Sequence, residues 1–330
     1  MDTRAKLLKL LEDNRETYIS GAVLAKELSV SRNAVWKTVE SLRLEGHCIS
    51  AITNKGYRIE NSGDVLSASG IMKCLKPDGV FRVEVRKSVE STNTIVRDLA
   101  AKGEPEGFVM VAEEQTAGKG RMGRDFYSPA RHGVYFSLLL RPGCIAREAA
   151  LITSAAAVAT ARAIEEVFGV SVGIKWVNDL FVGDRKVCGI LTEAVFNMEN
   201  GLIDSAVLGI GVNVTRPEEG FPGTLKEIAG FITDKETIVG NVRSRLIAAA
   251  ISNFWVFYQS LAAREFLAEY RSRSIVLGKE IYVVSGDKRM PAYAERIDDD
   301  CGLVVRYENG DVAVLGSGEV SIRQIIAKKL

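Results

Sequence analysis

Three basic residues and three glycines lie within the ten-residue segment Gln115–Arg124, a combination suited to binding an anion. The basic residues are Lys119, Arg121 and Arg124, and the glycines are Gly118, Gly120 and Gly123. Ammonium and guanidinium groups donate strong hydrogen bonds to phosphate or carboxylate. Glycines let the backbone approach a ligand and direct successive N–H groups at one anion. A solvated basic turn is the alternative interpretation, and the density of these residues favours the anion site.

The segment differs from the two common phosphate-binding loops. A Walker A loop has Ser or Thr directly after its lysine and a helix behind it, whereas Arg124-Asp125 follows the last glycine here. A dinucleotide-binding loop also leads into a helix. The apolar runs 108–112 and 134–140 instead predict a strand on each side of the loop.

Two further polar groups stand at the ends of predicted elements. Ser91-Thr92-Asn93 lies where a predicted strand over 82–86 gives way to a predicted helix over 95–101, and from this segment alone helix capping is preferred to ligand binding. Lys175 closes a predicted strand before the turn Asn178-Asp179. A lysine at the end of a buried strand needs an anion, which Asp179, Glu193 or a ligand could supply.

The elements around these residues predict an α+β domain with a mostly antiparallel sheet. Helical spacing and alanine content indicate a buried helix over 148–168. A hairpin is expected over 180–194, a strand over 202–212, and helices over 238–260 and 264–270. Four short apolar runs after residue 278, separated by Gly and Asp turns, predict a small SH3-like β-barrel. They are 281–284, 292–297, 303–307 and 311–315.

The first sixty residues predict a winged helix-turn-helix, with helices over 4–12, 22–28 and 32–45 and a two-stranded wing over 46–59. Between Ser31 and Arg58 there are five cations and two acids, a local excess of +3. The candidate DNA-contacting residues are Ser31, Arg32, Asn33, Lys37, Lys55 and Arg58. Arg32, Asn33 and Lys37 are assigned to a major groove and the wing cations to phosphates. A module used for packing or dimerisation is the alternative.

Composition sets the remaining limits. A chain of 330 residues predicts two or three domains, and the boundaries 1–62, 63–275 and 276–330 follow from a polar linker at 61–64 and the change of pattern near 278. Five scattered cysteines indicate reduced thiols in the cytoplasm, and neither a signal peptide nor a membrane span is expected. With two histidines, His-based triads and His-ligated metal sites are not expected.

Three motifs taken together resemble the biotin protein ligase family. They are Glu90-Ser91-Thr92-Asn93, the loop Gln115–Arg124, and Lys175-Trp176-x-Asn178-Asp179. With the helix-turn-helix in front, the chain resembles the bifunctional biotin–[acetyl-CoA-carboxylase] ligase and biotin operon repressor along essentially its whole length. The resemblance implies that biotin, ATP and Mg²⁺ give biotinyl-5′-AMP, from which a lysine of the biotin carboxyl carrier protein takes the biotinyl group. It also implies operator DNA as a partner and a homodimer when the adenylate is bound.

The resemblance assigns roles to individual positions. Catalytic roles fall to Lys175 and Arg121, with Lys175 near the carboxylate and the α-phosphate. The binding residues are Ser91, Thr92, Asn93, Gln115, Gly118, Lys119, Gly120, Arg121, Arg124, Lys175 and Asn213. Phe126 either stacks on adenine or packs in the core. Two departures stand out: Lys119 where repressor-type members have Arg, and Val177 where the family has Pro, so the turn lacks a preset φ.

Two alternatives remain open at the level of sequence. One is a transcription regulator whose central domain only senses biotin, although sensing needs no phosphate clamp. The other is a relative of the lipoate ligases.

Overall fold

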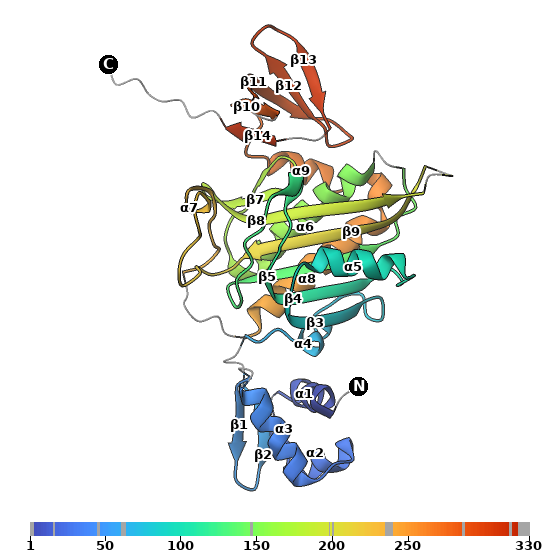
Figure 1. Ribbon diagram of the computed structural model, residues 1–330, viewed down its shortest axis with the longest axis vertical. Helices are drawn as coiled ribbons and strands as arrows, with labels where there is room; N and C mark the ends of the chain where they lie inside the picture. The colour runs from blue at the N-terminus through green and yellow to red at the C-terminus, as the bar shows by residue number, and fades with distance from the viewer. Residues whose placement is uncertain are drawn as a thin grey trace.

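The computed structural model describes residues 3–15, 17–44, 47–60, 64–145, 148–197, 199, 201–234, 240–285, 288–316 and 319–322. The chain is elongated, with a helical N-terminal part, a central sheet layered with helices, and a C-terminal sheet at the far end (Figure 1). Within these ranges no helix is both long enough and apolar enough to cross a bilayer.

The N-terminal part is the predicted helix-turn-helix with its wing. Its elements are α1 (Thr3–Asp13), α2 (Gly21–Leu28), α3 (Arg32–Leu44), β1 (Ile49–Ile52) and β2 (Gly56–Ile59). Ser20 caps α2 by accepting from the Val23 N–H at 3.2 Å, and Ser31 accepts from the Ala34 N–H at 3.1 Å at the start of α3. Leu24, Val35 and Val39 are buried in one small core, so the three helices form a self-contained unit.

The predicted linker is only partly a linker. Asn61, Ser62 and Gly63 lie outside the described residues, but the side chain of Asp64 is only 6% exposed and pairs with Arg243 at the start of α8 (Val242–Gln259). Helix α4 (Ala68–Met72) follows at once, and its cap Ser67 donates to Glu12 of α1 at 2.8 Å. The chain therefore docks onto the central part directly after the wing.

The central sheet has the strand order β3-β4-β5-β9-β8-β7-β6 in the described part of the chain. Its strands are β3 (Arg82–Val89), β4 (Phe108–Gln115), β5 (Gly133–Leu140), β6 (Gly173–Lys175), β7 (Asp179–Val182), β8 (Arg185–Phe196) and β9 (Ile203–Asn213). Only β3 and β4 pair in parallel, which confirms the mostly antiparallel prediction.

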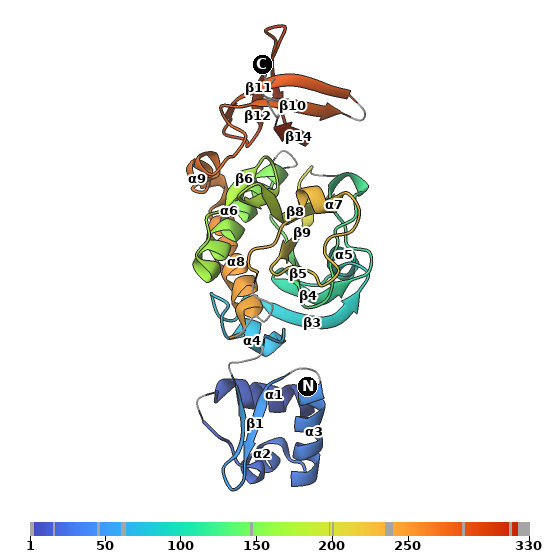
Figure 2. The same cartoon turned by 90° about the vertical axis from the view of Figure 1, so that its left-hand side faces the viewer.

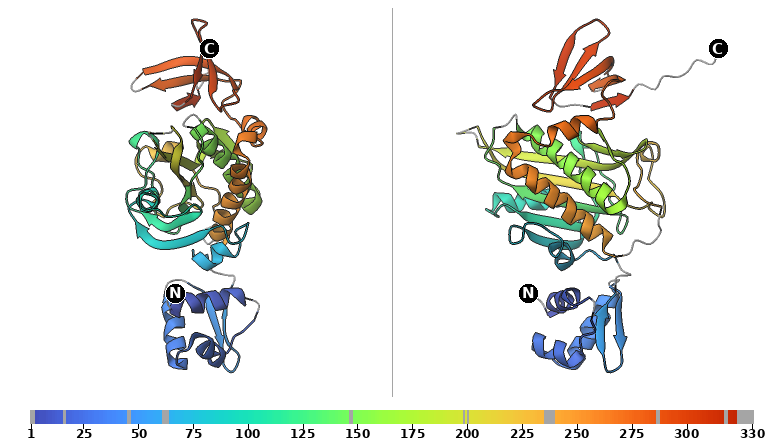
Figure 3. Two further views of the ribbon diagram at one scale, coloured as in Figure 1. Left: turned by 90° about the vertical axis from the view of Figure 1, so that its right-hand side faces the viewer. Right: turned by 180° about the vertical axis from the view of Figure 1, so that it is seen from behind.

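Helices cover both faces of this sheet (Figures 2 and 3). Helix α5 (Thr92–Ala101) lies on one face, and α6 (Ala149–Phe168) lies with α8 on the other. Alanines such as Ala155 and Ala159 are fully buried in α6, since small side chains let it approach α8 and the sheet closely. Helix α8 begins at Val242; residues 238 and 239 of the predicted helix fall in the undescribed stretch 235–239.

The C-terminal part confirms a β-structure with one more strand than the four expected. Helices α7 (Leu225–Ile228) and α9 (Leu267–Ser272) belong to the central part. The strands of the C-terminal part are β10 (Glu280–Ser285), β11 (Lys288–Ile297), β12 (Leu303–Tyr307), β13 (Val312–Leu315) and β14 (Glu319–Ile322). The five strands form an antiparallel sheet in the order β13-β12-β11-β10-β14. Helix α9 starts later than predicted because Arg264 has a φ of 57°, outside the helical region.

Candidate functional site

Two adjoining cavities open beside the glycine-rich loop. The larger has a volume of about 220 Å³ and the smaller about 50 Å³. Both are lined by Gly120, Arg121, Phe126, Asn178 and Lys186, so these residues stand at their junction. The loop, β8 and the turn between β6 and β7 meet there.

The smaller cavity is built around a buried polar network at the start of α5. Thr92 and Asn93 are buried, and their side-chain oxygens lie 2.7 and 2.6 Å from the Ser137 hydroxyl on β5. Gln115 accepts from the Thr92 N–H at 2.9 Å and donates to Ser128 at 3.0 Å. Buried polar groups need such partners, and this network presents a fixed set of donors and acceptors to a small polar ligand.

The predicted capping role of Ser91-Thr92-Asn93 is not what the structure shows. Ser91 occupies the N-cap position of α5 but makes no side-chain capping hydrogen bond. All three residues line the smaller cavity. Ser137 and Ser128 were missed because a lone serine within a strand or loop carries no sequence signal.

Glycines in β8 and β9 make room for the site. A Cβ on Gly209 would lie 2.1 Å from the Asn93 Oδ1, and a Cβ on Gly211 would lie 2.4 Å from the Phe126 ring. Glycine within a strand often marks a close approach of this kind. The Gly209-x-Gly211 spacing in an otherwise apolar strand was the available signal.

The glycine-rich loop is a hydrogen-bonded turn in this structure. The Gly120 N–H donates to Arg124 O at 2.7 Å and the Arg124 N–H to Arg121 O at 3.3 Å, so these groups do not point together at an anion as predicted. Gly118 is placed by packing, since a Cβ there would lie 2.4 Å from Phe126 O, and it lines neither cavity. Lys119, Gly120 and Arg121 line the smaller cavity.

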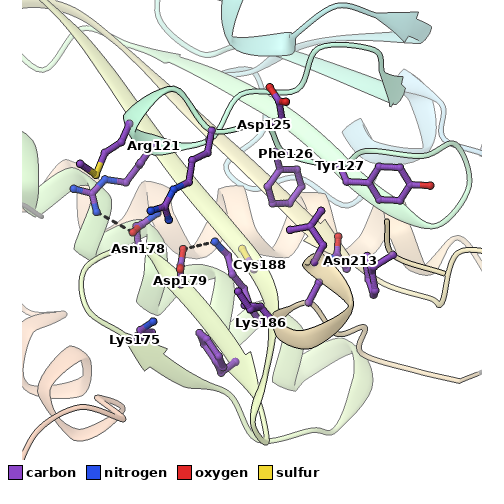
Figure 4. Close-up of a pocket in the computed structure, with 18 of the residues that line it drawn as sticks. Arg121, Asp125, Phe126, Tyr127, Lys175, Asn178, Asp179, Lys186, Cys188 and Asn213 are labelled. Carbon is purple, nitrogen blue, oxygen red and sulfur yellow. Dashed lines mark hydrogen bonds and ion pairs between the residues drawn. The ribbon is translucent and has the colours of Figure 1, made fainter. Parts of the chain in front are cut away.

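The larger cavity gathers the remaining predicted residues (Figure 4). Arg124, Lys175 and Asn213 line it, with Asn213 donating to Gly230 O at 3.0 Å. Arg121 donates to the Asn178 Oδ1 at 3.0 Å, which connects the loop to the turn after β6. The apolar lining includes Trp176, Phe181, Phe221 and Ile228. Flat apolar walls with a few polar groups suit an aromatic ring carrying a polar chain.

The two carboxylates considered as partners of Lys175 each contact another side chain in the structure. Asp179 pairs with Lys186 at 2.7 Å, and Glu193 accepts from Asn93 at 2.7 Å. The Lys175 ammonium lies 5.9 Å from the centre of the Phe181 ring. Lys186 was missed as a site residue because its Gly-Asp-Arg-Lys setting is that of an exposed hairpin turn.

Val177 lies in the turn between β6 and β7, at the position where the family has proline. The Trp176–Val177 peptide is cis. The turn is fixed by hydrogen bonds from the Tyr270 hydroxyl to Val177 O at 2.9 Å and from the Asn178 Nδ2 to Ile190 O at 2.9 Å. Trp176 donates to Cys301 O at 2.9 Å in the C-terminal part. These hydrogen bonds restrain the turn, as a proline ring would do at position 177.

Other titratable groups at the site offer little chemistry. Burial raises the pKa of the Cys188 thiol, so this cysteine in the wall of the larger cavity stays neutral. Among the described residues, no three His, Cys, Asp or Glu side chains gather as a metal site.

The predicted DNA-contacting surface lies apart, on α3 and the wing. Arg32, Asn33, Lys37 and Lys55 are exposed, as phosphate or base contacts require. Ser31 is exposed too, although its hydroxyl is used as a cap. Arg58 is engaged within the domain: it binds Glu60 at 2.9 Å, and its guanidinium carbon lies 4.6 Å from the centre of the Tyr18 ring.

Comparison with known proteins agrees with the separation between an N-terminal helix-turn-helix and a central part that contains the cavities. Residues 85–213 match the Biotin/lipoate A/B protein ligase family, and residues 3–58 match an HTH domain. The bifunctional ligase/repressor BirA of Bacillus subtilis is 39% identical over 227 residues, which is 68% of this chain and 69% of that protein. The BirA of Escherichia coli is 29% identical over 328 residues, 96% of each chain.

A solved structure is similar in fold. The biotin protein ligase from Aquifex aeolicus in complex with biotin and ATP superposes with a TM-score of 0.59 at 26% identity, covering 73% of this chain and 98% of that one. The ligase match covers the strands that build both cavities, and the HTH match covers the helices that carry the exposed cations. With these matches and a relative of 39% identity over two thirds of both chains, this protein belongs to the biotin protein ligases, in their bifunctional ligase/repressor family.

Proposed function

We propose that this protein joins biotin to ATP as biotinyl-5′-AMP, transfers the biotinyl group to a lysine of a biotin carboxyl carrier protein, and represses transcription in response to biotin. The observation that carries the proposal is the pair of cavities that meet at Arg121 and Lys186. A small polar compartment joined to a larger apolar one, with cations at the junction, suits a mixed anhydride of a carboxylic acid and a nucleotide.

The smaller cavity suits the fused rings of biotin. Its ureido group has two N–H donors and one carbonyl acceptor, and the Thr92, Asn93 and Gln115 network offers both kinds of partner. The larger cavity suits adenosine, with Phe126 at the boundary and Trp176 in the wall. Arg124 and Asn213 are candidates for the nucleotide side, as is Lys175.

The chemistry needs charge neutralisation at the junction. A biotin carboxylate oxygen attacks the α-phosphorus, the bond from that phosphorus to the bridging oxygen breaks, and pyrophosphate leaves. The carrier lysine, as a neutral amine, then attacks the acyl carbon and AMP leaves. Arg121 and Lys186 line both cavities, so a carboxylate and an α-phosphate that met at the junction would lie near both cations, which would reduce the repulsion between the two anions. Of the two lysines, Lys186 lines both cavities and pairs with Asp179 at 2.7 Å, whereas Lys175 lines only the larger cavity.

Mg²⁺ is the expected companion of the ATP phosphates. The carboxylates that line the larger cavity are Asp125 and Asp179, and oxygen ligands of this type suit Mg²⁺. The ion supplies further charge neutralisation on the phosphates when ATP binds.

Incubation with biotin, ATP, Mg²⁺ and an acceptor carrier domain tests the proposal. Transfer of biotin to the acceptor is expected, and absence of both transfer and biotin-dependent pyrophosphate exchange would refute the ligase role. A biotin sensor without ligase activity would bind biotin in calorimetry and still fail this assay. Lipoate as a competing substrate distinguishes a biotin ligase from a relative of the lipoate ligases. Lipoate should not compete with biotin, because its dithiolane ring forms no hydrogen bonds with the polar network.

Regulation is proposed to combine DNA binding with dimer formation. The exposed cations of α3 and the wing suit an operator, and one such module gives limited affinity, so a homodimer on a two-fold site is expected when the adenylate is bound. Sedimentation velocity with and without biotinyl-5′-AMP measures this. Both macromolecular partners and the five free cysteines fit a cytoplasmic protein.

A further inference from the structure

The buried amide of Asn93 is held from two sides. Its Nδ2 donates to the Glu193 Oε2 at 2.7 Å, and its Oδ1 lies 2.6 Å from the Ser137 hydroxyl. Gly209 permits this position, because a Cβ there would lie 2.1 Å from the Asn93 Oδ1. Asn93 lines the smaller cavity and Glu193 does not, so the carboxylate can reach a ligand only through the amide.

The charge of Glu193 determines which way the amide faces. An ionised carboxylate only accepts hydrogen bonds, whereas an amide has a donating and an accepting end. The Nδ2 is therefore drawn to Glu193 and the Oδ1 to the hydroxyl of Ser137. The reversed amide would set its oxygen against the carboxylate and leave a buried acceptor unpaired, which is unfavourable.

Glu193 lies on β8, on the sheet face that carries α5. It is half-buried, and its other oxygen lies 3.4 Å from the Arg97 guanidinium of α5. Its cross-strand neighbour is Val207, which packs against α5. The helix thus supplies both the amide to be oriented and a cation that steadies the carboxylate.

We propose that Glu193 is a positioning residue that selects for the ureido ring of biotin by fixing the orientation of Asn93. This inference rests on the proposed function. A ligand whose ring has directional donors and acceptors gains from a fixed amide, whereas a ring without them gains nothing. Glu193 takes no part in adenylate chemistry, because it lines neither cavity.

The test is steady-state pyrophosphate exchange by the full chain, with Glu193→Gln, Glu193→Ala and the control Arg97→Met. Gln keeps the shape but can donate as well as accept, so it no longer selects one orientation. We expect KM for biotin to rise about 10-fold in Glu193→Gln, the size of a lost charged hydrogen bond, with kcat and KM for ATP within about twofold. Arg97→Met removes the ion pair but keeps the Asn93 contact, and about a twofold change at most is expected.

Two further arms distinguish positioning from general support of the fold. Desthiobiotin keeps the ureido ring and lacks the thioether ring, so its KM should rise by the same factor. In an Asn93→Ala background, Glu193→Gln should have no additional effect, because the residue it orients is gone.

The outcomes separate the two proposals. A wild-type chain that does not exchange pyrophosphate with biotin refutes the proposed function and this inference with it. An active wild type whose KM for biotin is unchanged in both Glu193 variants overturns the role of Glu193 alone. The role of Glu193 is also overturned if kcat falls, or KM for ATP rises, by as much as KM for biotin changes. It is overturned as well if the effects of Glu193→Gln and Asn93→Ala are fully additive.

Discussion

Lys186 and Lys175 carry the same charge, yet they occupy different parts of the site. Lys186 comes from β8 and lines both cavities, and its ammonium lies 2.7 Å from Asp179. Lys175 ends β6 and lines only the larger cavity, near Phe181. Under the proposed function, a group at the junction would lie near both the carboxylate and the α-phosphate, and Lys175 would lie on the nucleotide side.

We predict that Lys186→Met lowers the rate of adenylate formation about 100-fold, the usual effect of removing one charge-stabilising donor. Lys175→Ala is expected to impair the same step while the chain remains folded. Biotin-dependent pyrophosphate exchange measures both, with the exposed Lys102→Met as the matched control. Wild-type exchange by Lys186→Met would remove it from the proposed role.

Lys119 lines the smaller cavity and is exposed at the loop surface. Its single ammonium group cannot make the paired contacts that a guanidinium makes. We predict that Lys119→Arg slows release of biotinyl-5′-AMP several-fold and leaves transfer to the carrier intact. Dissociation of radiolabelled adenylate from the purified chain measures this, and an unchanged release rate would mean that the side chain does not touch the adenylate.

At the scale of elements, Arg243 connects three parts of the chain. From the first turn of α8 it binds Asp64 at 2.6 Å and Glu113 of β4 at 2.7 Å, and it donates to Gly133 O at the start of β5 at 3.3 Å. Glu113 and Gly133 flank the segment that contains the glycine-rich loop. The neighbouring carboxylates raise the pKa of the Arg243 guanidinium despite its burial, so the network is ionic.

Removing the guanidinium should be costly because it leaves two carboxylates facing each other. For Arg243→Met we predict a loss of about 3–5 kcal/mol in the free energy of unfolding. Arg86→Met, which breaks the half-exposed pair with Glu84, should change it by less than about 1 kcal/mol. Urea unfolding followed by circular dichroism compares the two, and equal midpoints would contradict the role of the network.

His47, between α3 and β1, gives a second prediction at this scale. It is buried, and burial together with Arg4 and Arg15 lowers its pKa to about 4 from the usual 6.5. The folded chain thus favours neutral imidazole; this contribution is complete above pH 6.5 and is lost as pH falls towards 4.

Compared with His47→Gln, the wild type should therefore lose about 2–3 kcal/mol more stability between pH 7 and pH 4.5. Unfolding midpoints of both proteins at the two pH values test this. Parallel pH dependence in the two proteins would show that His47 does not titrate in this way.

At the scale of the whole molecule, helix α3 lies in the N-terminal part, well away from β7 and β8 of the central sheet (Figure 1), and these two strands contribute to the lining of the larger cavity. The two functions should therefore separate by mutation. The Arg32→Ala, Lys37→Ala pair is expected to lose specific DNA binding and retain ligase activity. Duplexes selected from a random library by the wild type provide the probe.

The salt dependence of DNA affinity separates the two kinds of contact. Loss of the wing phosphate contact in Lys55→Ala should lower the slope by about one, whereas loss of the base contacts of Arg32 and Lys37 should lower specific affinity more than the slope. A matched pair of substitutions in α1, Lys6→Ala with Lys9→Ala, retains the recognition helix and should bind almost as the wild type does. Unchanged affinity in the Arg32, Lys37 pair would place the DNA surface elsewhere.

Much of the architecture could be predicted from sequence because it depends on local signals. Apolar periodicity located α1, α2, α3 and most strands, and Ser31 marked the start of α3. Density of glycine and cations located the loop beside the cavities. The antiparallel preference also followed, since tight turns such as Gly183-Asp184 permit antiparallel pairing only.

What tertiary structure decided is which side chains meet. Lys186 follows a Gly-Asp-Arg sequence typical of an exposed turn. Only the packing of β8 against the glycine-rich loop brings its side chain to the junction of the cavities. Ser137, Glu193 and Asn93 lie on three separate elements, so the network that orients the amide has no local signature. Asp64 lies in a polar segment typical of a linker, and its contact with Arg243, 179 residues later, exists only in the folded chain. Sequence patterns record the surroundings of each residue along the chain, whereas these contacts depend on segments brought together by burial of the whole core.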